Sequence, residues 1–245
     1  MDNKFSHLKN YLHVLFFALV CCSVFFLADP SISVMHLSDS ISNVSKDKVT
    51  VVIDAGHGGR DPGKVGVNGA LEKDINLSIA IKLKKLLEEN DYNVIMIRDD
   101  DKGLYSDSDS NKKAADMRKR VEIINNSNAL LAISIHQNSF TQESIKGAQV
   151  FYYSGSPDGK KYAEIMQQQI KEYIKDENKR QAKSNDSYYM LKKTSCPIVI
   201  VECGYLSNQT EASLLIDDAY QEKMAWAIHL GLINYVKEYT TKTGK

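Results

Sequence analysis

The sequence predicts a single α/β domain with a mainly parallel, twisted sheet flanked by helices. Three observations indicate this fold class. Short apolar runs alternate with longer segments of helical periodicity, no internal repeat is present, and 245 residues suit one domain with a tail. We place this domain at residues 49–240, behind an apolar N-terminal segment and a polar linker.

Residues 1–28 are predicted to be a signal peptide or a membrane anchor. Lys4 and Lys9 precede an apolar run over residues 11–28, and a basic lead before such a run is typical of exported or anchored chains. The run is close to the roughly 18–20 residues that span a bilayer as a helix, so cleavage and retention both remain open. Residues 29–48 are polar and rich in Ser, which indicates a linker.

The first half of the domain begins with a strand at residues 49–53, where β-branched residues predominate without a break. Residues 74–90 place isoleucines and leucines on one side and lysines on the other, which predicts an amphipathic helix. A second strand is predicted at residues 93–97. Residues 99–113 are acidic, Ser-rich and aperiodic, so we expect a surface loop there.

The second half continues the alternation of strands and helices, which favours parallel pairing. Residues 176–186 are polar and carry no predicted element. The predicted strands are residues 129–135, 148–152 and 198–201. The predicted helices are residues 114–126, residues 159–176 and the closing stretch 212–238.

Composition excludes some classes of function. Lys plus Arg and Asp plus Glu balance at 31 each, so no basic surplus indicates nucleic-acid binding. Cys196 and Cys203 bracket the last strand, and at about 3.3 Å per residue they lie roughly 20 Å apart, beyond the reach of a disulfide. We expect both to be packing residues. His229 lies in an apolar helical stretch and is expected to be structural as well.

Side chains capable of metal chemistry follow three predicted strands. His57 comes after the first strand, His136 after the third and Glu202 directly after the last. Glu72 lies just before the first long helix, on a loop that leaves the same edge. Ligands of open α/β sheets bind at the carboxyl ends of the strands, so we expect these four residues to meet there.

Two imidazoles and a carboxylate with one open position are typical of catalytic zinc, and a further carboxylate supplies a general base. Each residue also has a simpler interpretation, because single histidines are often structural and Glu is common near helix starts. Glu202 is the exception, since a carboxylate after an apolar strand is unfavourable unless it is paired or near a metal. Asn138 either binds substrate or holds His136.

Four ordered blocks resemble the zinc N-acetylmuramoyl-L-alanine amidases, and the similarity covers nearly all of residues 49–238. The resemblance implies that His57, Glu72 and His136 bind Zn²⁺ and that Glu202 is the catalytic carboxylate. It also implies hydrolysis of the amide between the lactyl group of N-acetylmuramic acid and L-alanine of the peptidoglycan stem peptide. The blocks are residues 52–59 (VIDAGHGG), 71–77 (LEKDINL), 134–138 (SIHQN) and 201–208 (VECGYLSN).

A bare catalytic domain behind one apolar segment is similar to the spore-cortex branch of this family. That likeness implies a role in forming muramic δ-lactam, the mark read at germination. It also implies action on the outer face of the cytoplasmic membrane, in the cell wall or in the spore intermembrane space. Two alternatives stay open: a zinc peptidase acting on stem peptides, and a wall-binding scaffold regulated by a partner. An activating protein partner is compatible with each.

Overall fold

Six strands form one sheet in the computed structural model, which describes residues 48–175 and 177–243. Their order is β2-β1-β3-β6-β4-β5. Strands β2, β1, β3 and β6 run parallel, whereas β4 pairs antiparallel with β6 and parallel with β5. The prediction of a mainly parallel sheet is therefore confirmed. The strands are β1 (Thr50–Ala55), β2 (Asn93–Met96), β3 (Leu131–Asn138), β4 (Gln149–Tyr152), β5 (Lys183–Ser184) and β6 (Ile198–Tyr205).

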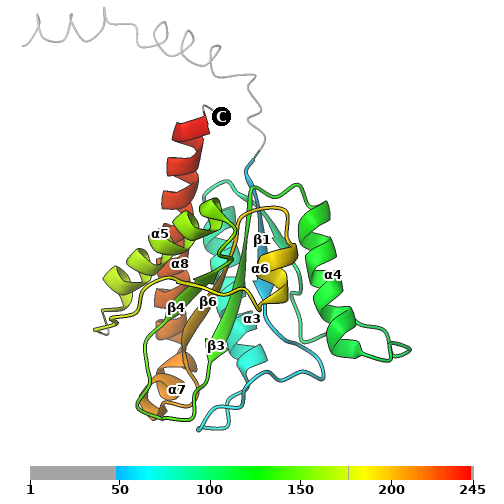
Figure 1. The fold of residues 1–245 in the computed structure, drawn as a ribbon. Helices are drawn as coiled ribbons and strands as arrows, with labels where there is room; N and C mark the ends of the chain where they lie inside the picture. The colour runs from blue at the N-terminus through cyan, green and yellow to red at the C-terminus, as the bar shows by residue number, and fades with distance from the viewer. Residues whose placement is uncertain (1–47, 176, 244–245) are drawn as a thin grey trace, which may run out of the picture. The chain divides into compact units, whose positions relative to one another are not determined.

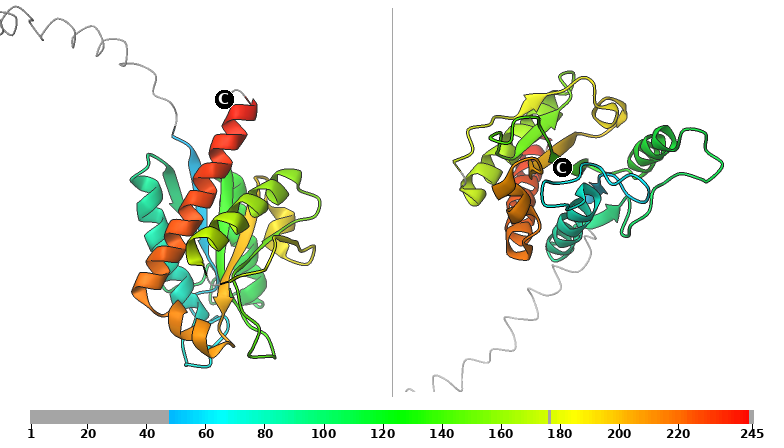
Figure 2. Two further views of the ribbon diagram at one scale, coloured as in Figure 1. Left: turned by 90° about the vertical axis from the view of Figure 1, so that its left-hand side faces the viewer. Right: turned by 90° about the horizontal axis from the view of Figure 1, so that it is seen from below.

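Helices cover both faces of the sheet (Figure 1). Side chains of α3, α5 and α8 pack with one face in the larger apolar cluster, and those of α4 and α6 pack with the other face in a smaller one. Figure 2 shows α8 lying across the first of these faces. The helices are α3 (Glu72–Glu88), α4 (Lys112–Asn126), α5 (Pro157–Ile174), α6 (Tyr189–Lys193), α7 (Gln209–Leu215) and α8 (Asp218–Thr243).

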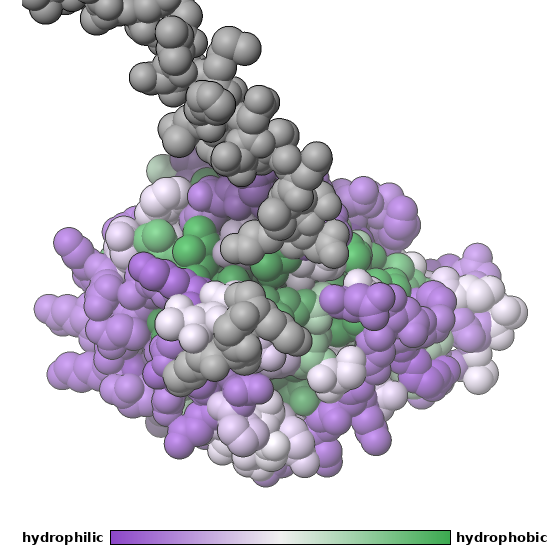
Figure 3. All heavy atoms as spheres, turned by 90° about the horizontal axis from the view of Figure 1, so that it is seen from above, coloured by the Kyte–Doolittle hydropathy of each residue, from purple (hydrophilic) through white to green (hydrophobic). Residues whose placement is uncertain are grey.

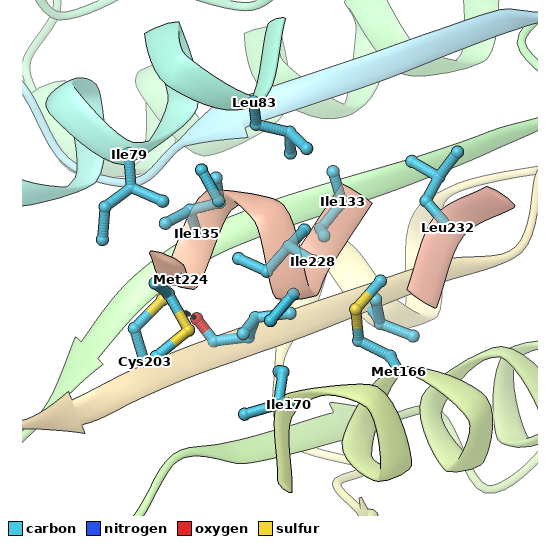
Figure 4. Close-up of a cluster of buried hydrophobic side chains, with 14 of the residues drawn as sticks. Ile79, Leu83, Ile133, Ile135, Met166, Ile170, Cys203, Met224, Ile228 and Leu232 are labelled. Atoms are coloured by element: carbon cyan, nitrogen blue, oxygen red, sulfur yellow. Dashed lines mark hydrogen bonds between the residues drawn. The ribbon is translucent and has the colours of Figure 1, made fainter. Parts of the chain in front are cut away.

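The larger core cluster joins the centre of the sheet to its helices. Leu83 of α3, Ile133 of β3 and Ile228 of α8 are all 0% exposed and meet in this cluster (Figure 4). Burying such a side chain stabilises the folded state by about 1.5–3 kcal/mol. The core therefore holds the sheet, and with it the positions of the strand ends. At the end of the molecule where β1 begins, hydrophilic side chains occupy the outer surface and hydrophobic ones gather towards the middle (Figure 3).

The register of the parallel strands brings their carboxyl ends to one edge. Ala55 of β1 lies opposite Ile135 of β3, and His136 of β3 lies opposite Glu202 of β6. The register shifts between His136 and Asn138, and such an irregularity re-aims the side chains beside it. The right-hand view of Figure 2 is from this edge.

Several predicted boundaries were wrong. Glu72 is the first residue of α3 and does not lie on a preceding loop. The helix was predicted to begin at residue 74, but the carbonyl of Leu71 already accepts from the amides of Asp74 and Ile75, so the first turn starts earlier. Likewise, Glu202 lies within β6, which is buried throughout to Tyr205, and does not follow it.

Other elements were missed or displaced. Helix α4 begins at Lys112 because the Asn111 side chain caps the amide of Ala114. Strand β5 lies in the polar stretch 176–186, which indicated no element, and helix α6 lies in the following segment, for which no element was predicted. Cys196 and Cys203 are free, and His229 is buried, all as expected.

The predicted signal or anchor at residues 1–28 lies outside the described residues, as do residues 29–47 of the predicted linker. Among the helices of residues 48–243 that the structure describes, none has the length and apolarity needed to cross a membrane.

Candidate metal centre and active site

Three side chains converge at the carboxyl edge of the sheet. Nε2 of His57 lies 3.2 Å from Oε1 of Glu72, and Nδ1 of His136 lies 3.0 Å from the same oxygen. All three ligand atoms fall within 4.8 Å of one another. The imidazole rings are 5.0 Å apart and nearly perpendicular. The predicted ligands therefore meet around one point.

His57 is held in an uncommon backbone conformation. Its φ of 63° is left-handed, which costs a residue with a side chain about 1–2 kcal/mol. Its ring contacts a second carboxylate, since Nδ1 lies 2.9 Å from Oδ2 of Asp61. Asp61 in turn accepts from the amide of Gly63. A carboxylate on the second nitrogen of a ligating histidine fixes the tautomer and the ring orientation.

Gly56 leaves the space that His136 occupies. A β-carbon at Gly56 would lie 2.2 Å from Cε1 and 2.3 Å from Nε2 of that ring. Since atoms do not approach so closely, any other residue at this position would displace the imidazole. The glycine that precedes His57 is thus required by the neighbouring strand β3.

Glu72 is buried and held on both oxygens. Oε1 accepts from the backbone N–H of Gln137 at 3.0 Å, and Oε2 accepts from the backbone N–H of Lys64 at 2.8 Å. Burial alone would raise the pKa of Glu72, but hydrogen bonds from His136 and His57 hold it below its ordinary value. The carboxyl group of Glu72 is therefore ionised at neutral pH.

His136 titrates higher than a free histidine. Burial would lower its pKa, but the hydrogen bond with Glu72 and the charge of that carboxylate raise it to about 8. The pair Glu72–His136 thus favours a cation beside the carboxylate. A divalent metal provides positive charge at the same place, with neutral imidazole as the ligand.

Glu202 is a buried carboxylate beside this cluster. It is 7% exposed, and among the described residues its Oε2 has no hydrogen-bond partner. Burial raises the pKa of Glu202 to about 7, against the opposing charge of His136. A carboxyl group that titrates near neutrality can both accept and release a proton at physiological pH.

A cavity of about 320 Å³ opens onto these groups. Its lining includes His57, Glu72, His136, Asn138 and Glu202, so the predicted site residues all face one space. Oδ1 of Asn138 accepts from the amide of Ser139 at 2.8 Å. Its side-chain amide nitrogen donates no hydrogen bond to another described residue, which leaves two N–H donors for a ligand.

The donor set suits zinc. Two imidazole nitrogens and one carboxylate oxygen are ligands that Zn²⁺ uses in catalytic sites, and the Asp61 contact supplies the usual support for one of them. Glu202, whose Oε2 is unpartnered among the described residues, lines the same cavity as these three side chains. The residues present therefore fit a catalytic metal.

Comparison with known proteins agrees with this geometry. A family model described as N-acetylmuramoyl-L-alanine amidase matches residues 51–234. The chain belongs to this amidase family.

Two members of the family are especially similar to this amidase in sequence or structure. The germination-specific N-acetylmuramoyl-L-alanine amidase of Bacillus subtilis is 37% identical over 191 residues, covering 77% of this chain and 80% of that protein. The CwlD amidase of Clostridioides difficile, solved in complex with the GerS lipoprotein, is 42% identical with a TM-score of 0.75. That match covers 78% of this amidase and 99% of CwlD.

A third relative comes from another organism. The amidase AmiC2 of Nostoc punctiforme is 33% identical with a TM-score of 0.69, covering 77% of this chain and 97% of that one. The identity of both solved structures with this amidase is high enough to support the family as well as the fold.

Sequence reasoning missed residues that support the amidase site. Asp61 was given no role in the sequence analysis, because it lies in an irregular loop where spacing along the chain does not indicate contact with His57. Tyr188, which lines the cavity, lies directly before the unpredicted α6, in a segment without a predicted element. Arg98 and Arg120 touch the His57 loop from distant parts of the chain, and no local pattern indicates those contacts.

Proposed function

We propose that this amidase uses Zn²⁺, bound by His57, Glu72 and His136, with Glu202 as its catalytic carboxylate. The substrate bond is the amide between the lactyl group of N-acetylmuramic acid and L-alanine of the stem peptide. The observation that carries the proposal is the convergence of three ligand atoms within 4.8 Å, beside the unpartnered oxygen of Glu202. Mass spectrometry of the products of peptidoglycan digestion, with zinc present, tests it.

When bound, zinc lowers the pKa of a water molecule to about 7 and polarises the scissile carbonyl. Glu202 accepts a proton from the attacking water at Oε2, because this oxygen faces no other acceptor or donor of the described chain. It then donates that proton to the departing nitrogen of L-alanine. The second transfer is necessary, since an unprotonated amine is a poor leaving group.

Asn138 is proposed to bind substrate. With Oδ1 engaged by Ser139, its N–H groups are available to an oxygen of the glycan or the stem peptide. A second cavity of about 300 Å³ shares His57, Asp61, Lys113 and His136 with the first. We propose that the substrate lies across both cavities, so that the bond to be cut sits near the two histidines.

We propose a role in spore-cortex maturation, through the formation of muramic δ-lactam. The support is the similarity to the germination-specific amidase of Bacillus subtilis and to CwlD of Clostridioides difficile. Disrupting the gene should leave sporulation intact, remove muramic δ-lactam from the cortex and block germination. A mutant with normal cortex composition and a defect in separating daughter cells would contradict this role.

We further propose that the amidase acts outside the cytoplasm, behind a signal or anchor at residues 1–28 and a linker at residues 29–48. Relatives named as probable cell wall amidases support extracytoplasmic action. CwlD binds the GerS lipoprotein, so a protein partner at the membrane surface is part of the proposal. Deleting residues 1–28 should yield a soluble, folded catalytic domain in the cytoplasm. Circular dichroism and gel filtration would check this, and aggregation of the truncated chain in every host would contradict it.

A further inference from the structure

Arg98 is a buried cation that contacts backbone carbonyls in place of a carboxylate. It lies two residues beyond β2 and is 2% exposed. Nε donates to Ala55 at 2.8 Å, and Nη2 donates to Gly56 at 3.0 Å and to Lys73 at 2.8 Å. Nη1 donates to the backbone carbonyl of Asp100 at 3.0 Å. Within the described part of the chain no carboxylate forms an ion pair with Arg98. Burying a charge is costly, so this placement needs a reason.

The carbonyls that Arg98 binds belong to two ligand-bearing segments. Ala55 and Gly56 immediately precede His57, and Lys73 immediately follows Glu72. One planar guanidinium therefore joins the end of β1 to the first turn of α3. Because the group is rigid and its donors are fixed in a fork, these contacts set the distance between the two segments.

The third ligand is connected to the same carbonyls. Nδ2 of Asn76 donates to Gly56 at 3.1 Å, and Oδ1 of Asn76 accepts from Gln137 at 3.1 Å. Gln137 follows His136 directly, and its backbone N–H donates to the Glu72 carboxylate. The segments that carry the three candidate ligands thus share one hydrogen-bond network, with Arg98 at its centre.

The loop that Arg98 holds is strained. His57 has a φ of 63°, and such a conformation persists only where the surroundings determine it. Arg120 assists from the other side, donating to Ala55 at 2.9 Å and to His57 at 2.6 Å. Without these donors the peptide units before His57 would be less firmly held, and with them the position of His57 Nε2 facing Glu72.

We propose that Arg98 is a positioning residue that sets the metal affinity of the site, by locking the carbonyls next to His57 and Glu72 in one arrangement. The inference rests on the proposed function, since it concerns the same metal. Arg98 itself does not touch the metal or the substrate. It acts through the backbone of the ligands.

Arg98 is a better test position than Arg120. Arg120 is ion-paired with buried Asp54 and with Asp116, so its removal would leave a carboxylate buried and unpaired, which strongly destabilises a fold. Removing Arg98 leaves only carbonyls, which water can satisfy. Arg98→Lys keeps the charge and loses the fork, and Arg98→Gln keeps one amide donor group.

The experiment measures Zn²⁺ dissociation constants of the full chain by competition with a chromophoric chelator, without substrate. Arg98→Lys and Arg98→Gln should bind Zn²⁺ about 10–100-fold more weakly, the range found when support for a metal ligand is lost. The matched control is Gln167→Met. Gln167 is also 2% exposed and bonds the backbone of Ala148 and Val150, away from the site. It should lose thermal stability with unchanged Zn²⁺ affinity.

Each outcome decides the matter. Wild-type Zn²⁺ affinity in a folded Arg98 variant would overturn the proposal. Failure of both Arg98 variants to fold would also overturn it, because Arg98 would then support the whole domain. A similar loss of affinity in Gln167→Met would show that general destabilisation is the cause. If the wild-type chain itself binds no Zn²⁺, the proposed function fails, and that result is distinct from the other three.

Discussion

Replacing Glu202 by Gln should give a folded, zinc-loaded protein whose hydrolysis is about 10²–10⁴-fold slower, the usual contribution of a general acid–base. Gln has the size of Glu, and Oε2 of Glu202 has no partner in the described chain, so the substitution breaks no contact at that atom. The proton carrier is lost, and the ligand atoms are unchanged. Single-turnover rates on purified peptidoglycan, with zinc measured by atomic emission on the same samples, check both parts.

Glu72→Gln is the control for this prediction, because the two carboxylates lie beside the same histidines. An amide at position 72 is a poor metal ligand, and it also cannot accept from Gln137, Lys64 and the imidazoles as a carboxylate does. Zinc content should therefore fall. If Glu72→Gln retained zinc and Glu202→Gln lost it, the roles of the two residues would have to be exchanged.

Replacing His57 or His136 by Ala should lower zinc content and activity together. Each change removes one of three protein ligands, and the loss of affinity should exceed the roughly 10–100-fold that removal of a supporting contact costs. Because a histidine must be deprotonated to bind metal, the wild type itself loses affinity at acidic pH. The defect relative to wild type should therefore be greatest at pH values where the imidazoles are neutral. Equilibrium dialysis against Zn²⁺ at two pH values would measure it.

His229→Ala is the matched control for the two ligand variants. His229 is a buried histidine of α8 whose ring lies 5.3 Å from that of Trp226, and it lines neither of the two cavities at the site. Its replacement should leave the zinc stoichiometry unchanged even if the midpoint of thermal unfolding falls. Full zinc occupancy in His57→Ala or in His136→Ala would rule out the proposed ligand set.

The meeting of the site residues could be predicted because it follows from sheet topology. Parallel strands end at the same edge, so residues at the ends of the first, third and last predicted strands had to be neighbours. His136 and Glu202 are indeed opposite each other in the register of β3 and β6. The prediction required no knowledge of side-chain contacts, only the order of elements and the apolar runs that mark strands.

The supporting residues could not be predicted, because their contacts are long-range and their local sequence is ordinary. Arg98 is followed by an acidic, aperiodic stretch, and nothing near it indicates burial or a bond to Gly56. Helix α6 has only five residues, which is too short for periodicity to be recognised. Glu72 was placed on a loop because its helix begins without a side-chain cap.

The most direct test of the central claim is hydrolysis of peptidoglycan in H₂¹⁸O, with zinc present, followed by mass spectrometry of the products. If the amide between the lactyl group and L-alanine is cut, one ¹⁸O atom should appear in the lactyl carboxylate of muramic acid. The released stem peptides should be whole, unlabelled and begin with L-alanine, and the glycan chains should be intact. Appearance of ¹⁸O in a peptide carboxylate, with shortened stems, would show a peptidase and contradict the account.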